Sequence, residues 1–122
     1  MAKILIVDDS DDLLETLTMM LKVKEHEIIT SNNFSDTVKS ILSFHPDLLI
    51  LDVLLGNSKG REMCKSIKKF FPVLPILLMS ANPELLKDFE ACNADAILEK
   101  PFDMYKLNDT INGLLKRKLQ NI

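Results

Sequence analysis

The stretch "KILIVDDSDD" (Lys3–Asp12) decides the fold, because it joins a continuous aliphatic run to a concentrated acidic end. The run Ile4–Val7 does not alternate apolar with polar residues, which is typical of a strand buried on both faces of a parallel sheet. Asp8 and Asp9 follow directly, and two more aspartates come just beyond them. Like charges gathered at the end of a buried strand repel one another. The stretch therefore predicts a buried strand that ends where a positive group binds.

Short aliphatic runs of the same kind recur along the chain and alternate with segments of helical periodicity. The further runs predict strands within Glu27–Thr30, Asp47–Leu55, Pro75–Met79 and Ala96–Leu98. Apolar positions three and four residues apart predict a helix after each strand, at 13–22, 34–42, 63–71, 85–89 and 103–115. This alternation predicts an α/β fold, a doubly wound five-stranded parallel sheet with strand order 2-1-3-4-5 and helices on both faces.

The same periodicity predicts which side chains form the core and where helices begin. Asn33 is a suitable N-cap for the second helix, and Pro83 lies near the start of the fourth. The core is predicted to include Phe34, Val38, Ile41, Leu42, one of Phe70 and Phe71, and the methionines Met19, Met20, Met63 and Met79. Solvent-facing positions are predicted for His26, His45, Lys65, Lys68 and Lys69, which show no partner pattern.

Length and composition limit the class of protein. The 122 residues suit one domain, so residues 1–122 are predicted to form a single unit. The formal net charge of −3 gives no basic footprint for nucleic acid. No apolar run reaches the length that spans a bilayer, and no signal-peptide pattern opens the chain, so no membrane partner is expected. Cys64 and Cys92 form no motif, which favours a reduced, cytoplasmic setting.

The residues that end the predicted strands carry the chemistry. In doubly wound sheets, ligands bind outside the carboxyl ends of the strands. The predicted strands end in Asp8 and Asp9, in Asp52, in Ser80, and in Lys100. Three carboxylates against one ammonium leave excess negative charge, which a divalent cation would offset. Mg²⁺ is the predicted cofactor, because it takes one or two carboxylates, keeps waters and is completed by phosphate oxygens.

The same set predicts a phosphoryl-transfer site. Asp52 can act as the nucleophile without a general base, because a carboxylate is ionised at neutral pH. The metal would offset charge between this carboxylate and the incoming phosphoryl group. Lys100, the Ser80 hydroxyl and the backbone N–H of Ala81 would bind the phosphoryl oxygens.

Four segments, "ILIVDD", "LLILD", "LLMSA" and "ILEKPF", in this order and at this spacing, resemble the response-regulator receiver domain (CheY-like) of two-component signalling. The resemblance covers essentially the whole chain, and Gly60 falls where the family has a glycine. It implies a flavodoxin-like (βα)5 fold. It also implies roles for single residues: Asp52 as phosphoacceptor; Asp8, Asp9, Asp52 and the Leu54 carbonyl as Mg²⁺ ligands; Ser80 as the switch hydroxyl; and a cis bond between Lys100 and Pro101.

The resemblance further implies a signalling switch that catalyses its own phosphorylation and slow dephosphorylation and is not a turnover enzyme. The phosphoryl donor would be a sensor histidine kinase or a phosphotransfer protein. A downstream protein would read the surface made by the fourth helix, the fifth strand and the fifth helix, which the family also uses for dimerisation, so a homodimer is a candidate assembly. Leu54 and Asn82 occupy the positions that tune the lifetime of the phosphorylated state.

Three positions depart from the family pattern. Ile97 stands three residues before Lys100, where the family often has Tyr or Phe, so an aromatic ring cannot couple to Ser80 there. The spacing from Ser80 to Lys100 is shorter than in typical receivers, which shortens the region of the fourth helix. Gly56 replaces the usual proline and widens the conformational range of the loop after Asp52.

Three other functions compete with this interpretation. A haloacid-dehalogenase-type aspartyl-phosphate phosphatase uses Asp, Mg²⁺, Ser or Thr and Lys, but its nucleophile lies on the first strand. A flavin or nucleotide carrier would need a Gly- or Ser-rich first loop, and the loop after Val7 is acidic. A receiver-like module that binds partners without phosphorylation is favoured by Ile97 and by the shortened region, and opposed by the complete acidic set.

Overall fold

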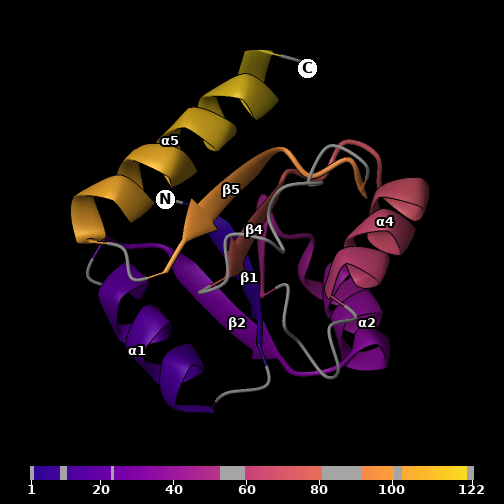
Figure 1. Ribbon diagram of the computed structural model, residues 1–122, viewed down its shortest axis with the longest axis horizontal. Helices are drawn as coiled ribbons and strands as arrows, with labels where there is room; N and C mark the ends of the chain where they lie inside the picture. The colour runs from indigo at the N-terminus through magenta and orange to yellow at the C-terminus, as the bar shows by residue number, and fades with distance from the viewer. Residues whose placement is uncertain are drawn as a thin grey trace.

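A five-stranded parallel sheet forms the centre of the molecule, with helices on both of its faces (Figure 1). The structure is a computed structural model that describes residues 2–8, 11–22, 24–52, 60–80, 92–100 and 103–120. The strand order is β2-β1-β3-β4-β5, which confirms the predicted fold class and order. The strands are β1 (Lys3–Val7), β2 (Glu27–Ser31), β3 (Leu48–Asp52), β4 (Ile76–Ser80) and β5 (Ala96–Glu99).

Helices follow the strands where the apolar periodicity predicted them. Those in the described ranges are α1 (Asp11–Lys22), α2 (Phe34–Phe44), α4 (Gly60–Phe70) and α5 (Met104–Gln120). Asn33 caps α2 as predicted, because its side chain accepts a hydrogen bond of 2.8 Å from the Asp36 N–H. Asp103 accepts one of 2.7 Å from the Lys106 N–H, so α5 begins one residue after the predicted start. The predicted helix at 85–89 lies outside the described residues.

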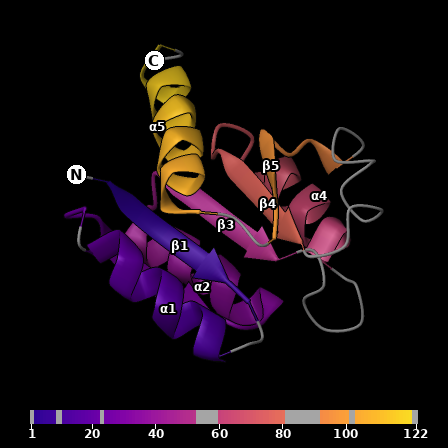
Figure 2. The same ribbon diagram turned by 60° about the vertical axis from the view of Figure 1, so that its left-hand side comes forward.

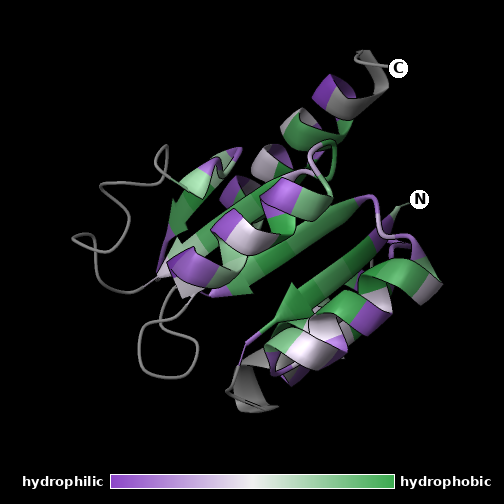
Figure 3. Cartoon of the chain, turned by 90° about the vertical axis from the view of Figure 1, so that its right-hand side faces the viewer, coloured by the Kyte–Doolittle hydropathy of each residue, from purple (hydrophilic) through white to green (hydrophobic). Residues whose placement is uncertain are grey.

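The sheet separates two hydrophobic cores. Ile4 and Ile6 pack on the side covered by α1 and α5, while Leu5 and Val7 pack on the side covered by α2 and α4 (Figure 1). The arrowheads of β1, β3 and β4 point the same way in Figure 2, so the carboxyl ends of these strands share one edge. The strands are hydrophobic along most of their length (Figure 3). Burial on both faces is the reason that their sequences show runs and not alternation.

Several predicted core residues are exposed. Ile41, Met63 and Met79 are buried as predicted. The predictions for the following residues were wrong: Met19 is 70% exposed, Phe34 42% and Leu42 59%. Of Phe70 and Phe71, Phe71 packs against the core as one of the two was predicted to do, and Phe70 is 69% exposed. Only a narrow stripe of each helix meets the sheet, and the apolar pattern of these helices is wider than that stripe. The apolar positions next to the stripe therefore face outward.

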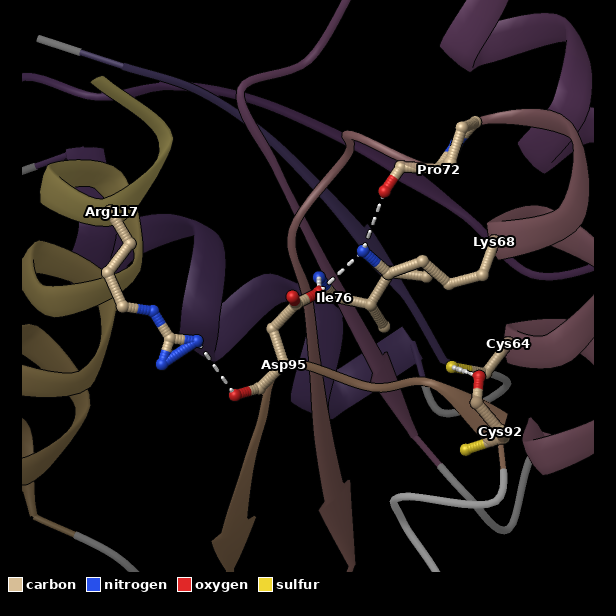
Figure 4. A network of polar contacts seen from close by, with 7 residues as sticks. All are labelled: Cys64, Lys68, Pro72, Ile76, Cys92, Asp95 and Arg117. Carbon is tan, nitrogen blue, oxygen red and sulfur yellow. Dashed lines mark hydrogen bonds and ion pairs between the residues drawn. The ribbon is translucent and has the colours of Figure 1, made fainter. Parts of the chain in front are cut away.

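A polar network joins α4, β4, β5 and α5 at the amino ends of the strands (Figure 4). Lys68 Nζ lies 2.7 Å from Asp95 Oδ2, and the same carboxylate oxygen accepts a hydrogen bond of 2.8 Å from the Ile76 N–H. Arg117 donates to the Asp95 carbonyl across 3.3 Å, and Lys68 also donates to the Pro72 carbonyl. The Lys68 side chain is only 9% exposed, so its assignment to a solvated helix face was wrong.

The two cysteines are both buried, in keeping with the absence of a motif. The Cys64 thiol donates to the Cys92 carbonyl across 3.4 Å (Figure 4). Burial raises the pKa of the Cys64 thiol, which keeps it protonated and unreactive. Within the described ranges, no helix combines the length and the apolar character needed to cross a bilayer.

Candidate functional site

The polar residues that end the strands meet at the carboxyl edge of the sheet. Asp52 is the last residue of β3, Ser80 is the last residue of β4, and Asp8 follows β1 directly. Asp52 pairs in register with Met79, and Ser80 pairs with Glu99, which places Lys100 one residue beyond that pair. The strand order makes β1, β3 and β4 neighbours. The structure thus brings Asp8, Asp52, Ser80 and Lys100 to one edge, from four strands.

Two buried carboxylates share one ammonium group at this edge. Lys100 Nζ lies 3.1 Å from Asp52 Oδ2 and 3.7 Å from Asp8 Oδ2. Asp8 is 1% exposed and Asp52 is 6% exposed. The three side chains together carry a formal charge of −1, because two negative groups face a single positive one. Excess negative charge held away from water attracts a cation.

Ser80 is fully buried, and its backbone positions Lys100. The Ser80 carbonyl accepts a hydrogen bond of 2.8 Å from the Lys100 N–H. This bond extends the β4–β5 ladder by one residue past β5. The lysine therefore starts from a fixed backbone position, and its side chain reaches back across β4 to Asp52.

The donor set fits Mg²⁺. This ion prefers hard oxygen ligands, takes one or two carboxylates from the protein and keeps several waters. Asp8 and Asp52 supply two carboxylates side by side, with the excess negative charge that a divalent cation offsets. Across the described ranges, no group of three or more acidic, histidine or cysteine side chains gathers into a ready-made cage. The third predicted carboxylate, Asp9, lies outside those ranges.

Other predicted site residues also fall outside the described ranges. They are Leu54, Gly56, Ala81, Asn82 and Pro101. Ile97 is described: it lies on β5 in register with Leu78 and is 39% exposed. This aliphatic side chain occupies the outward-facing position at which the family often has an aromatic ring.

A buried hydroxyl pair supports the site and was missed from the sequence. The Ser31 carbonyl accepts a hydrogen bond of 3.2 Å from the Asp8 N–H. The Ser31 hydroxyl lies 2.6 Å from the Thr37 hydroxyl, and Thr37 donates to the Asn33 carbonyl across 2.7 Å. These contacts tie the start of α2 to the end of β2 and so to the backbone of Asp8. Ser and Thr are common in exposed loops, so their sequence gave no signal of this burial.

Known proteins share the sequence pattern of this chain. The sequence model of the response regulator receiver domain matches residues 4–112 of this chain. The chain belongs to the response regulator receiver domain family. This receiver chain is 30% identical over 120 residues to the alkaline phosphatase synthesis transcriptional regulatory protein PhoP of Bacillus subtilis, covering 94% of this chain and 49% of PhoP. It is 31% identical over 122 residues to the nisin biosynthesis regulatory protein NisR of Lactococcus lactis, covering 98% of this chain and 52% of NisR.

The fold of the receiver is shared with solved structures. The receiver domain of NtrX from Brucella abortus superposes with a TM-score of 0.86 at 29% identity, over 93% of this chain and 98% of that one. The chain spans about half the length of the curated relatives it matches. The family places the chain among the response regulators of two-component systems, which are signalling proteins whose receiver domains generally bind Mg²⁺.

Proposed function

We propose that this receiver is a phosphorylatable signalling switch whose residues 1–122 form a single domain and whose phosphoacceptor is Asp52. The observation that supports it most is the position of Asp52. It ends a central strand, is 6% exposed, lies 3.1 Å from Lys100 and shares that lysine with Asp8. Phosphoryl transfer of this kind needs a nucleophilic carboxylate, a neighbouring cationic group and a metal site.

The proposed reaction starts with the donor, a phosphohistidine on a sensor histidine kinase or a phosphotransfer protein. An Asp52 carboxylate oxygen attacks phosphorus, an O–P bond forms, and the P–N bond to the donor histidine breaks. The released imidazole keeps the bonding electron pair and takes up a proton from solvent. When bound, Mg²⁺ supplies charge stabilisation to the phosphoryl oxygens and would be held by Asp8, Asp52 and, by family resemblance, Asp9 and the Leu54 carbonyl.

The chain's own residues would hold the phosphoryl group in place. Lys100 already lies within ion-pair distance of Asp52 and would move its ammonium onto a phosphoryl oxygen. The Ser80 hydroxyl and, by resemblance, the Ala81 N–H would bind the others. Buried and fully surrounded, Ser80 can change position only if its neighbours repack. That repacking would carry the signal to the outer surface, where Ile97 lies on β5.

The proposed reaction also implies partners and a location for the protein. The protein would act as a switch with slow self-catalysed dephosphorylation and would change its affinity for a downstream protein, either alone or as a homodimer. A cytoplasmic location belongs to the same proposal, because the phosphate of a kinase phosphohistidine comes from ATP. Neither nucleic acid nor membrane is a proposed partner of this domain.

Intact-protein mass spectrometry after incubation with acetyl phosphate tests the proposal. The expected result is one phosphoryl adduct that requires Mg²⁺, is absent with EDTA and is absent in Asp52→Asn. Asp109→Asn, on the exposed face of α5, is the matched control and keeps the adduct. An adduct that survives in Asp52→Asn would place the chemistry on another residue. If neither acetyl phosphate nor a phosphorylated histidine kinase gives an adduct, the chain is a binding module that works without phosphorylation.

A further inference from the structure

A groove lined by apolar side chains lies at the opposite end of the sheet from Asp52. Its walls come from the end of α2, the end of α4 and the loop that leads into β4, and they include Leu42, His45, Phe70 and Val73. The groove has a volume of about 420 Å³. Sites that hold organic ligands or partner side chains commonly have volumes of roughly 300–1,000 Å³. This groove is therefore large enough to take the side chains of a partner.

Large hydrophobic side chains gather at the groove although they are open to solvent. Seven such side chains are exposed in the described part of the chain, and three of them line this one feature. Leu42 is 59% exposed, Phe70 is 69% exposed and Val73 is 82% exposed. Single exposed hydrophobic residues are ordinary, but several that adjoin one groove mark an interaction surface. Leu42, whose core assignment on α2 was wrong, and the exposed Phe70 at the end of α4 both belong to this surface.

An exposed lysine lies at the groove, and the residues that line the groove include no acidic side chain. The segments 37–46 and 63–75, which include its walls, contain four lysines and no aspartate or glutamate, although the whole chain has a formal charge of −3. Lys68 is held by Asp95 (Figure 4), but Lys39, Lys65 and Lys69 are exposed. Lys69 Nζ lies 5.9 Å from the centre of the Phe70 ring, at the groove itself. Lys39 lies on another face of α2, where it lines a second pocket with Asp36 and Ser43.

We propose that this α2–α4 groove docks an acidic amphipathic segment of a partner protein. Apolar side chains of that segment would fill the groove beside Leu42, Phe70 and Val73, and one of its carboxylates would lie against Lys69. Complementary charge at a rim speeds association and selects the partner. A second copy of this chain fits less well, because two such faces would bring lysines against lysines. The proposal does not depend on the proposed function, because the groove and Asp52 lie at opposite ends of the strands.

A selection from a displayed library of random peptides, about four helical turns long, tests the proposal. The full chain is the bait. Enriched peptides are expected to carry apolar residues three and four positions apart, together with net negative charge. The affinity of one enriched peptide is then measured by fluorescence anisotropy against the wild type and single variants. Circular dichroism melts verify that each variant is folded.

Three variants and a matched control define the expected result. Val73→Asp should weaken binding about tenfold or more, because it removes an apolar contact and adds a like charge. Lys69→Glu should weaken it about threefold, and less at high salt. Met19→Asp changes an exposed hydrophobic residue on α1 and should leave the affinity unchanged. Asp52→Asn should also bind normally, which separates this proposal from the proposed function.

Other outcomes would overturn the proposal. Enriched peptides without an excess of acidic residues, or with equal affinity for Val73→Asp, would show that this groove is not the docking site. A concentration-dependent dimer in light scattering that Val73→Asp abolishes would assign the groove to a second copy of the chain. Displacement of the bound peptide by duplex DNA, weaker in the Lys69→Glu variant than in the wild type, would assign the lysines beside the groove to nucleic-acid binding.

Discussion

The charges of three side chains set the behaviour of the candidate site. Asp8 and Asp52 are almost fully buried, and both lie within 4 Å of the single ammonium of Lys100. Two unit charges at such a separation interact by about 1 kcal/mol in water and by about 4 kcal/mol at an effective dielectric constant of 20. One lysine cannot fully offset two carboxylates, so a bound cation lowers the free energy of the folded state.

A change at Asp52 should remove this coupling between Mg²⁺ and stability. In urea denaturation, Mg²⁺ at ten times its dissociation constant should stabilise the wild type by about 1.4 kcal/mol. Asp52→Asn should lose most of this increment, because one of the two described carboxylates becomes a neutral amide. The exposed Asp109→Asn should retain it in full. Equal Mg²⁺ stabilisation of wild type and Asp52→Asn would mean that the ion binds elsewhere.

His26 should make the stability of the protein depend on pH. Its Nδ1 accepts a hydrogen bond of 3.2 Å from the Ala2 N–H, so this nitrogen must be unprotonated in the folded protein. Burial lowers the pKa of His26 below its ordinary value of 6.5. Between the lowered value and 6.5 the unfolded chain binds more protons, so stability is full above about pH 6.5 and falls as the pH drops below it.

Urea titrations from pH 7.5 down to pH 5 measure this effect. His26→Asn keeps an acceptor that does not titrate, so its stability should fall less with decreasing pH than that of the wild type. His45→Asn makes the same change at an exposed helix C-cap, where φ is 53°, and should leave the wild-type pH dependence in place. If both variants follow the wild-type curve, the acid sensitivity comes from other groups.

Which residues could be predicted from the sequence depends on whether their partners are local. Asp8 and Asp52 could be placed because each ends an aliphatic run, and the topology brings such ends together. Lys68 was assigned to solvent, and that assignment was wrong; His26 was assigned to the surface and is half-buried. The partner of His26 is a backbone N–H 24 positions away, and that of Lys68 is Asp95 on the far side of β4. Only the folded chain reveals such pairs.

At the scale of elements, strands were easier to predict than helix faces. The described strands agree with the aliphatic runs to within about one residue at most ends. The reason is clearest in β1, β3 and β4, which are buried on both faces and so contain continuous aliphatic runs. The pattern of α2 and α4 showed apolar residues but not which of them would meet the sheet. Leu42 and Phe70 lie beside the buried stripe and face the groove. Apolar character predicts burial only when the packing partner is known.

The network around Asp95 should stabilise the contact of α4 with the strands. Asp95→Asn keeps a hydrogen-bond acceptor for the Ile76 N–H but removes the charge that faces the buried ammonium of Lys68. Urea denaturation should show a loss of about 2 kcal/mol in the free energy of unfolding. Asp109→Asn, which is exposed on α5, should lose less than about 0.5 kcal/mol.

A double variant separates the ion pair from the shape of the side chains. Lys68→Met in the Asp95→Asn background removes the ammonium that would otherwise stay buried without a charged partner. This double variant should be more stable than Asp95→Asn alone. A double variant that is less stable, with the losses simply added, would show that Lys68 and Asp95 contribute independently and not as a pair.

At the scale of the whole molecule, one sheet separates two cores and holds the two proposed sites at its opposite ends. Because all strands are parallel, their carboxyl ends share the edge that holds the candidate phosphorylation site, and their amino ends share the edge with the groove. The alternation of runs and helices was enough to predict this arrangement. The groove could not be predicted, because it depends on how far α2 and α4 stand apart at their ends. The two cores on opposite faces should therefore respond separately to mutation.

Additivity of core substitutions tests that separation. Leu17 on α1 and Ile67 on α4 are each 1% exposed and belong to different cores. Leu17→Ala and Ile67→Ala should each cost about 2–5 kcal/mol in urea denaturation. The double variant should equal their sum to within about 0.5 kcal/mol, because the sheet lies between them. Ile41→Ala with Ile67→Ala shares one core and should deviate from additivity. Strong coupling between Leu17 and Ile67 would instead mean that the sheet transmits packing changes from one face to the other.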